Sequence, residues 1–544
     1  MISRRALIAG LGGGGLSAGL LGLSLTAKSR TSTPGGSDVA HVRIDDLAKG
    51  EPIDPFIYGS NEVGTMDGGA ASVSFDRAAG VTVRRLGGNF LTGYNWRNNA
   101  TNAGKDWKHE NGAFLLGILG VEKKDWDHPA IVIDAFLANS RGAGAASLLT
   151  LPLSGQVAAD LDGAVAPSEA APSRRFLPAD WTGQPSAPGV SIPALLAHLV
   201  RTYGGARSGG VRGYYLDNEP GLWTDTHPRM VTSPPTIKSL IDRSLRAAKA
   251  IKAADPDALV LGPTSWGAPE FADFSKAPDW SDFRSHGTFL AAYLDAFRRE
   301  SERAGHRLLD RLDVHWYPFN RRGSLFRNEN PELAQAALDA PRSLDEAGFC
   351  EDSWVADAFG CGPGAGVRLP ILPFLRGVIA ENFPQTGLSI GEYAYGGGGL
   401  LATGLAVADA LGRFGRSGVS VANHWGALEG SIGEAYRLYR MKDSRGEFFG
   451  ATSLPAAGAG GFDLSLFAAR SDSGALQLIA LNKSPRPISF DLALASGRAP
   501  ALADVLGFDE IHPDCGQREP ADDASGGRLR LVAPPLSARR YRLG

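Results

Sequence analysis

Two glutamates stand at the ends of short apolar runs that have the character of buried strands. Glu219 lies in the run 213–220, where Pro220 stops the strand, and Glu392 lies in the run 388–395. Two facing carboxyl groups can hydrolyse a glycosidic bond, because a protonated one donates to the leaving oxygen while an ionised one attacks the sugar carbon. A separation of about 5 to 5.5 Å between them retains the configuration. The alternative is that both are ordinary surface acids in loops.

Polar side chains accompany the two glutamates. Asn218 directly precedes Glu219, and a third apolar run, 312–318, carries His315 and Tyr317. Because successive strand residues point to opposite faces, His315 and Tyr317 share one face of their strand. Either side chain can form a hydrogen bond with a carboxylate or a sugar hydroxyl. This combination favours catalysis over the surface-acid alternative.

Two consecutive arginines, Arg84 and Arg85, lie in the run 81–88 and therefore point to opposite sides of that strand. We expect Arg85 to reach the glutamates and to hold Glu392 ionised by its positive charge. Arg84 is expected to point outward and to pair with a helix.

Tryptophans supply the second half of a sugar site, because pyranose rings have apolar C–H faces that stack on aromatic rings. Trp223 follows Glu219 by four residues, and Trp425 ends the run 419–425. Both are expected to serve as sugar platforms. Trp96, in the loop after the run 81–88, is a further candidate, with packing beneath that loop as the alternative.

The elements that must position these residues follow a regular pattern, in which eight short apolar runs are separated by segments of helical periodicity. Ile237, Leu240, Ile241 and Ile251, for example, fall on one helical face. Eight such units predict a (β/α)8 (TIM) barrel over residues 56–455, with catalytic groups at the carboxyl ends of its strands. The predicted strands are 56–61, 81–88, 147–153, 213–220, 259–265, 312–318, 388–395 and 419–425.

Residues 456–544 show the alternation of half-buried antiparallel strands, as in Ile488, Phe490 and Leu492. A small antiparallel β-sandwich is predicted here, and the segment 41–55 is expected to contribute an N-terminal strand to it. The proline-rich segment 166–190 is predicted to be an irregular excursion on the active-site face of the barrel.

Charge and cysteine content exclude several classes of protein. Lys and Arg number 55 against 58 Asp and Glu, a net charge of −3, so neither a nucleic acid nor a stable membrane partner is expected. No histidine or cysteine spacing indicates a catalytic zinc site. Cys350 and Cys361 can form a disulfide in an oxidising compartment, with free thiols as the alternative.

The first residues have the pattern of a targeting segment. Arg4 and Arg5 precede an uncharged, glycine-rich stretch, 6–25. This predicts a twin-arginine export signal over residues 1–30, a linker over 31–40 and a periplasmic or extracellular location. An N-terminal membrane anchor is the alternative, although the many glycines make the stretch only weakly hydrophobic.

Longer motifs surround the candidate residues, including an Asn-rich stretch after the second predicted strand and the Asn-Glu-Pro, His-Trp-Tyr-Pro and Gly-Glu-Tyr sequences. Together they resemble glycoside hydrolase family 44, the endoglucanases and xyloglucanases of the clan A barrels, over nearly all of the chain after residue 40. The matching stretches are 84–89, 92–96, 98–100, 102–107, 216–220, 313–318, 391–393, 437–440 and 449–450.

The resemblance implies a retaining hydrolase of β-1,4-glucan chains, with Glu219 as acid/base and Glu392 as nucleophile. It also places Asn89, in the first matching stretch, among the residues expected to bind substrate. No cofactor is expected to be required. Some members of the family bind calcium, so the resemblance is compatible with a structural calcium ion, whose ligands the sequence leaves unassigned.

Three positions near the candidate residues depart from the family pattern. Gly221, Gly391 and Ala394 stand where the family usually has Ala, Thr and Asn. None of these departures removes a candidate catalytic carboxyl group.

The favoured interpretation is a secreted, monomeric enzyme that cleaves a polysaccharide internally. One alternative is another clan A activity, such as a mannanase or an exo-acting glycosidase, which would keep both glutamates. A second alternative is a non-catalytic carbohydrate-binding relative. The joint presence of Glu219, Glu392, Asn218 and Tyr317 argues against the second alternative.

Overall fold

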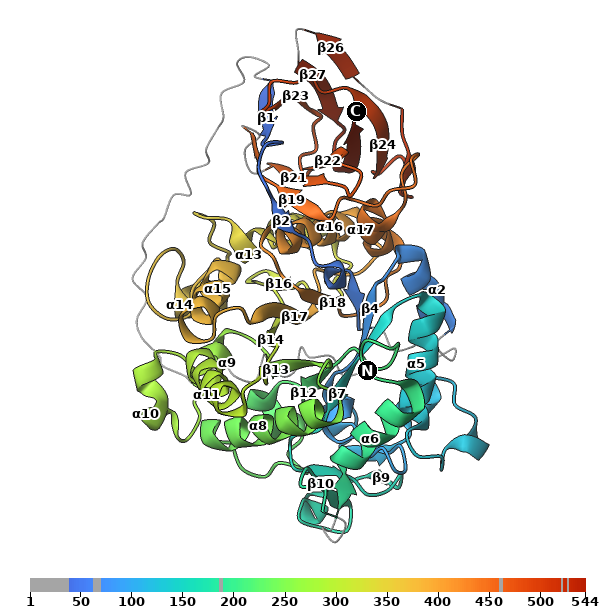
Figure 1. Cartoon of the computed structure of the whole chain (residues 1–544), viewed down its shortest axis with the longest axis vertical. Coiled ribbons are helices and arrows are strands. Elements are labelled where there is room, and N and C mark those ends of the chain that lie inside the picture. The colour runs from blue at the N-terminus through green and yellow to red at the C-terminus, as the bar shows by residue number, and fades with distance from the viewer. Residues whose placement is uncertain (1–38, 62–69, 185–188, 459–462, 520–521, 526–527) are drawn as a thin grey trace.

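The computed structural model describes residues 39–61, 70–184, 189–458, 463–519, 522–525 and 528–544. A barrel of parallel strands surrounded by helices carries a β-sandwich, which rests on helices α16 (Leu401–Arg416) and α17 (Gly430–Arg440) (Figure 1). The predicted export segment, 1–30, and the linker as far as residue 38 lie outside the described residues. No helix in the described part of the chain combines the length and the apolar character needed to cross a bilayer.

The barrel is closed by eight parallel strands, and each of them falls within or overlaps one of the predicted runs. The predicted (β/α)8 barrel is therefore confirmed. In order around the barrel, the strands are β3 (Gly59–Ser60), β4 (Val83–Leu86), β7 (Ala146–Leu151), β12 (Gly213–Leu216), β13 (Leu259–Ser265), β14 (Arg311–Trp316), β17 (Gly387–Tyr393) and β18 (Val421–His424).

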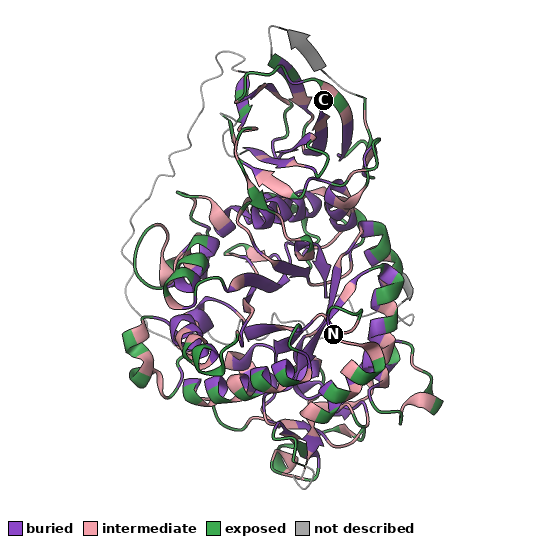
Figure 2. Ribbon diagram, in the orientation of Figure 1, coloured by how far each residue is buried: buried purple, intermediate pink, exposed green. Residues whose placement is uncertain are grey.

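A longer helix follows each strand and packs its apolar face on the barrel. In α8 this face is the predicted one, with Ile237, Leu240 and Ile251 buried, and the Thr236 hydroxyl caps the helix by accepting the backbone N–H of Ser239 at 3.0 Å. Figure 2 shows buried strands inside a ring of helices whose outer faces are exposed. The helices are α2 (Ala70–Ala79), α5 (Ile131–Ala143), α6 (Ile192–Tyr203), α8 (Ile237–Ala254), α11 (Phe289–Ala304), α15 (Ile371–Asn382), α16 (Leu401–Arg416) and α17 (Gly430–Arg440).

The barrel interior changes from apolar to polar along the strands. Its apolar layer consists of Val83, Leu148, Tyr215, Leu261 and Val421. Two residues further along β4 and β18, on the same strand faces, stand Arg85 and Asn423. Polar side chains therefore gather at the carboxyl ends of the strands, a region called the barrel mouth below.

The sandwich contains two sheets, and the predicted N-terminal strand lies inside one of them. Strand β1 (Ala40–Ile44) is antiparallel to β20 (Ala456–Gly458) and parallel to β23 (Ile488–Leu494), with Val42 opposite Leu492. The first sheet has the order β20 (Ala456–Gly458), β1 (Ala40–Ile44), β23 (Ile488–Leu494), β27 (Arg528–Ala533) and β26 (Asp522–Ser525). The second has the order β2 (Glu51–Pro52), β19 (Thr452–Leu454), β21 (Leu464–Arg470), β22 (Leu476–Asn482), β28 (Ser537–Leu543), β24 (Leu502–Phe508) and β25 (Gly516–Gln517).

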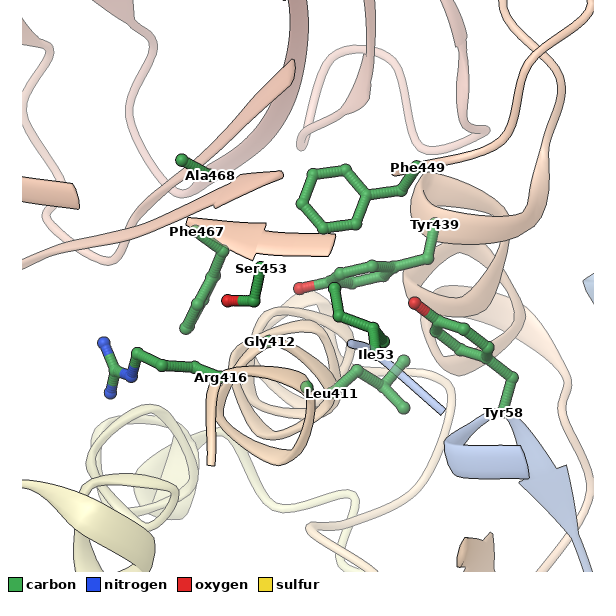
Figure 3. A pocket seen from close by; sticks show the side chains of 11 residues that line it. Ile53, Tyr58, Leu411, Gly412, Arg416, Tyr439, Phe449, Ser453, Phe467 and Ala468 are labelled. Atoms are coloured by element: carbon green, nitrogen blue, oxygen red, sulfur yellow. The ribbon is translucent and has the colours of Figure 1, made fainter. Parts of the chain in front are cut away.

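The junction, where α16 and α17 meet β19 and β21, is aromatic on one side and ionic on the other. Tyr439 of α17 packs edge-on against Phe449 at 5.2 Å between ring centroids, and a Cβ on Gly412 of α16 would lie 2.4 Å from the Phe467 ring (Figure 3). Glycine at position 412 thus permits the close approach of α16 to β21. The ionic side is formed by Asp409, Arg413 and Lys483, with Nε of Arg413 and Nζ of Lys483 at 2.9 and 3.0 Å from the Asp409 carboxylate.

Long connections leave the barrel mouth after β4, β7 and β14. In the connection after β7, the segment 166–190 is not irregular throughout, contrary to the prediction, because it contains strand β10 (Phe176–Asp180) and ends on the first residue of β11 (Val190–Ser191). The same connection also forms β8 (Gln156–Ala158) and β9 (Gly163–Ala164). These strands pair in two small sheets, one of which includes β5 (Thr101–Asn102) and β6 (Glu110–Gly112). They are too short to show an alternating pattern in the sequence.

The connection after β14 contains the hairpin β15 (Phe319–Asn320) and β16 (Gly323–Ser324), and the disulfide between Cys350 and Cys361. Cys350 and Cys361 are therefore bonded to each other and are not free thiols, whereas Cys515 is a free, buried thiol. The short helices are α3 (Asn89–Thr92), α4 (Phe114–Ile118), α7 (Trp223–Thr226), α9 (Ala268–Asp273), α10 (Trp280–Phe283), α12 (Ala334–Asp339), α13 (Arg342–Asp345) and α14 (Trp354–Phe359).

Candidate active site

Glu219 stands in a tight turn directly after β12. Both Asp217 and Glu219 have positive φ angles, +66° and +45°, in the left-handed region that disfavours most side chains. The buried Asp217 carboxylate compensates by accepting the backbone N–H groups of Leu153 and Ser154, and the N–H of Glu219 donates to the Thr264 carbonyl at 3.0 Å. Neighbouring strands therefore fix the direction of Glu219.

Glu392 is aimed by a β-bulge in β17. Ile390 lies opposite Val314 of β14, whereas Glu392 lies opposite the next residue, His315, so Gly391 is an extra residue in β17. A bulge redirects the side chains that follow it. Here it turns Glu392 into the barrel, where its side chain is completely buried.

Arg85 of β4 forms hydrogen bonds with residues at the ends of both strands that carry the glutamates, β12 and β17. Its Nη1 donates to Glu392 Oε1 at 2.7 Å and to Asn61 Oδ1 at 3.0 Å, and its Nη2 donates to Asn218 Oδ1 at 3.2 Å. The guanidinium group also lies over the Tyr215 ring, 4.5 Å from its centroid. The structure thus places Arg85 where the sequence predicted, with a positive charge directly on Glu392.

Arg84 points outward from the same strand, as predicted. Its Nε donates to the Asp76 carboxylate of helix α2 at 2.6 Å, and its Nη2 donates to the Ser72 hydroxyl at 2.9 Å. Both arginines are fully buried, and each forms an ion pair on its own face of β4, Arg84 with Asp76 and Arg85 with Glu392.

His315 and Tyr317 complete the surroundings of the glutamates. The Tyr317 hydroxyl donates to Glu392 Oε2 at 2.7 Å, while His315 Nδ1 lies 2.9 Å from Glu219 Oε1 and 3.5 Å from Glu392 Oε2. A carboxylate oxygen of Glu219, one of Glu392 and a ring nitrogen of His315 all lie within 4.8 Å of one another. The two carboxyl groups therefore face each other, with the imidazole beside both.

Asn218 and Asn89 form a buried amide chain that leads away from the pair. Asn218 Nδ2 donates to Asn89 Oδ1 at 3.0 Å, and Asn89 Nδ2 donates to Asp106 at 2.9 Å. Trp223 supports this chain from behind, because its indole N–H donates to the Asn218 carbonyl at 3.1 Å. The side chain of Trp223 is only 1% exposed, so the prediction that it is a sugar platform is wrong; it packs in the core instead.

Trp425 and Trp96 differ in position. Trp425 is half-buried at the end of β18, and a Cβ on Gly88 would lie 2.5 Å from its ring, so the indole lies against the end of β4 at the barrel mouth. Trp96 donates its indole N–H to the Ser191 carbonyl at 3.0 Å and stacks on His198 of α6. Of the two interpretations of Trp96, packing beneath its loop agrees with these contacts.

Two buried acids near the pair were missed by sequence reasoning. Asp313 of β14 is completely buried beside the Glu392 strand, and burial raises its pKa to about 6. Glu270 of α9 accepts from the Ser265 hydroxyl and the Trp266 N–H, both at 3.1 Å, and burial raises its pKa to about 8. For Asp313 a signal existed, because it precedes His315 by two residues and so shares its strand face. Glu270 lies on a short helix and gave no signal.

Glu219, His315 and Glu392 form the one group of three acidic, His or Cys side chains, among the described residues, close enough to share a metal ion. Calcium prefers six to eight oxygen ligands. With an imidazole in the group and Arg85 already paired with Glu392, these residues do not fit a structural calcium ion.

This arrangement can perform acid and nucleophilic chemistry on one bond. Glu392 receives a full positive charge and a phenol hydrogen bond, which stabilise its ionised form. Glu219 instead has the His315 ring against its carboxyl group, with Nδ1 at 2.9 Å from Oε1. The two glutamates therefore have different electrostatic surroundings, which is the condition for an acid and a nucleophile in one site.

Comparisons with known proteins agree with this chemistry. The model of glycoside hydrolase family 44 matches residues 100–320. An endoglucanase A of Paenibacillus lautus is 34% identical over 537 residues, which cover 95% of this chain and 74% of that protein. A β-mannanase/endoglucanase A of Caldicellulosiruptor saccharolyticus is 34% identical over 530 residues, covering 92% of this chain and 38% of that protein.

A solved structure is similar over almost the same length. A Paenibacillus polymyxa xyloglucanase from glycoside hydrolase family 44 superposes with a TM-score of 0.84 at 35% identity, covering 93% of this chain and 99% of that one.

Proposed function

The chain belongs to glycoside hydrolase family 44, and on that premise we propose that it is an exported, retaining enzyme that cleaves β-1,4-glucan chains internally. That it is a glycoside hydrolase of a polysaccharide follows from the family. The finer proposal is supported chiefly by one observation, the facing carboxyl groups of Glu219 and Glu392. Oxygens within 4.8 Å are in keeping with the short separation that a retaining mechanism uses.

In the first step, Glu392 attacks the anomeric carbon while Glu219 donates its proton to the leaving oxygen. The glycosidic bond breaks, the leaving sugar departs with a new hydroxyl, and the other half stays bonded to the Glu392 carboxylate. Arg85 and Tyr317 hold the two Glu392 oxygens in place, so the attacking lone pair is oriented before substrate binds.

In the second step, Glu219 is a carboxylate and takes a proton from water. The water oxygen bonds to the anomeric carbon, the bond to Glu392 breaks, and the configuration is retained after two inversions. His315, in contact with both carboxyl groups, keeps them aligned through both steps. The two-carboxylate mechanism needs no cofactor.

Asn218, Asn89 and Trp425 are proposed to bind the sugar. The amide nitrogen of Asn218 has two N–H donors, of which one is directed to Asn89, so the other can reach a sugar hydroxyl. The Trp425 indole at the barrel mouth offers a face for a pyranose ring. Internal cleavage requires several consecutive rings to bind along the barrel mouth.

The substrate is proposed to be a plain or decorated β-1,4-glucan, with mannan as the second candidate because one relative is a β-mannanase/endoglucanase. The test is incubation with soluble cellulose derivatives, xyloglucan and mannan, with viscosity, product sizes and the anomer first formed all recorded. We expect a rapid fall in viscosity, mixed-length products and initial β-anomer. Release of only mono- or disaccharide would favour an exo-acting enzyme, and initial α-anomer would exclude retention.

Export through the twin-arginine route is proposed from Arg4 and Arg5, and the Cys350–Cys361 disulfide supports an oxidising destination. Replacing both arginines by lysine should leave the protein in the cytoplasm. Unchanged export would favour the general secretory route, and a membrane-bound product would favour the anchor. We propose a monomer in solution, which light scattering after size-exclusion chromatography tests.

A further inference from the structure

Asp313 is a buried acid in the barrel mouth that the mechanism above does not use. It lies on β14 two residues before His315, and its side chain is completely shielded from solvent. An acid in such a place is costly to ionise, so its retention in the barrel calls for a physical reason. Its contacts supply one.

The Asp313 carboxylate occupies the place that a side chain at position 391 would need. A Cβ on Gly391 would lie 2.7 Å from both Asp313 carboxylate oxygens, closer than real Cβ atoms approach other atoms. Gly391 is not among the residues with positive φ, so its backbone conformation alone does not demand glycine. Gly391 is also the extra residue of the bulge that aims Glu392. The Asp313 carboxyl group therefore packs directly on that bulge.

Asp313 also shares the charged neighbours of Glu392. Burial raises the pKa of Asp313 to about 6, and the charge of Glu392 adds to this, while the charges of His315 and Arg85 act in the opposite direction. The titratable and charged groups that face it are Arg85 of β4, Tyr215 of β12, Tyr293 of α11, Glu392 of β17 and, on its own strand, His315.

We propose that Asp313 is a positioning residue for Glu392, which holds the β17 bulge in place by packing its carboxyl group on Gly391. The proposal rests on the proposed role of Glu392 as the nucleophile. The contact with Gly391 carries it.

The packing role predicts that shape, and not charge, matters at position 313. Since the pKa of Asp313 is raised to about 6, Asp313 is protonated on the acid limb of kcat/KM and removing its charge should not move that limb. Asp313→Asn keeps the side-chain shape and should keep most of kcat, whereas Asp313→Ala loses the contact and should lower kcat about tenfold. The matched control is Asp76→Ala, which removes the buried partner of Arg84 on the outer face of β4 and should leave kcat of the folded protein unchanged.

The packing role also predicts a rescue. Gly391→Ala should lower kcat at least about tenfold in a folded protein, because the new methyl group meets the Asp313 carboxylate and displaces Glu392. Combining it with Asp313→Ala, which vacates that space, should restore part of the lost kcat. Circular dichroism of each variant separates loss of fold from loss of position.

The result that would overturn the proposal is a wild-type kcat in Asp313→Ala together with no rescue in the double variant. If Gly391→Ala behaves like the wild type, the packing on Gly391 does not position Glu392. Glu392→Gln measured alongside tests the proposed function separately. Turnover by Glu392→Gln would refute the proposed function itself, whereas an inactive Glu392→Gln with a wild-type kcat in Asp313→Ala would refute only the role of Asp313.

Discussion

The barrel mouth and the junction both bury acids beside arginine, but with opposite balances of charge. At the junction, burial alone would raise the pKa of Asp409, yet Arg413 and Lys483 outweigh it and hold that pKa well below its usual range. At the barrel mouth, Arg85 is the arginine beside Glu392, and burial raises the pKa of the nearby Asp313 to about 6. The junction therefore keeps one protonation state at all moderate pH values, while the mouth contains acid that exchanges protons near neutrality. The first balance suits a structural contact and the second suits acid–base catalysis.

The largest expected effect is a loss of catalytic activity from a change at the barrel mouth. Glu392→Gln removes the proposed nucleophile and should lower kcat by at least about a thousandfold on every substrate. Steady-state assays on xyloglucan and on an aryl cellobioside measure this. Glu351→Gln, which alters a buried acid outside the mouth that bonds Ser353, serves as the control and should retain activity. Comparable losses in both variants would mean that Glu392 matters only for folding.

A smaller and substrate-dependent loss is expected for Glu219→Ala. Without its proton donor, the enzyme should lose most activity on polysaccharide, whose leaving group needs a proton, and keep the first step on aryl glycosides with good leaving groups. A burst of phenol followed by slow turnover would show this, and added azide should accelerate the second step. Equal losses on both substrate types would contradict the assignment of Glu219 as the acid.

At the junction the expected effect is on stability. Asp409→Ala leaves Lys483 buried without its carboxylate partner, while Arg413 keeps Asp345 and Glu346. The change should lower the free energy of unfolding by about 3 kcal/mol, with kcat/KM unchanged in the folded protein. Because the folded pKa of Asp409 is lowered, its contribution is present above the ordinary value of 3.8 and is lost only as the pH falls through the folded value. Urea unfolding at pH 7 and pH 5 should give the same difference between variant and wild type. A difference that changes between these pH values would show that the cluster is not in one protonation state.

The smallest expected effect concerns the pH dependence of stability at the barrel mouth. Burial raises the pKa of Glu270 to about 8, so Glu270 is protonated in the folded protein at pH values where the unfolded chain has lost that proton. The folded state then binds more protons, and its stability falls as the pH rises from 4.5, the ordinary pKa of a glutamate, towards 8. Glu270→Gln should flatten this dependence, measured as the urea midpoint across that range. An unchanged slope would place the titration on another group.

The barrel could be predicted from the sequence because its strands are buried on both faces. Such strands appear as continuous apolar runs between helical segments, and these eight runs correspond to the eight barrel strands. Because successive strand residues point to opposite faces, the sequence also placed Arg84 and Arg85 on different faces of β4, and the structure has Arg85 inside and Arg84 outside. These features depend on local pattern alone.

Other features of the site depend on contacts between distant segments. Regular alternation from Ser389 would place Glu392 on the outer face of β17, and only the bulge at Gly391 turns it inward. Trp223 follows Glu219 closely in sequence, but the fold packs its side chain into the hydrophobic core, which the spacing of the two residues does not reveal. The raised pKa of Asp313 likewise arises from closure of the barrel around it.

Strand β1 has a consequence for how the protein is made. Ala40 pairs with Phe490, so one of the first strands to leave the ribosome must wait for almost the whole chain before its parallel partner exists. Contacts between residues so far apart in the sequence form late and slowly, because the entropy of closing the intervening loop opposes them. Until then both edges of β1 are open to pairing with other chains. Deleting residues 40–44 would instead leave the facing edges of β20 and β23 unpaired permanently, so we expect a shortened protein to aggregate on overexpression even though every barrel strand is intact.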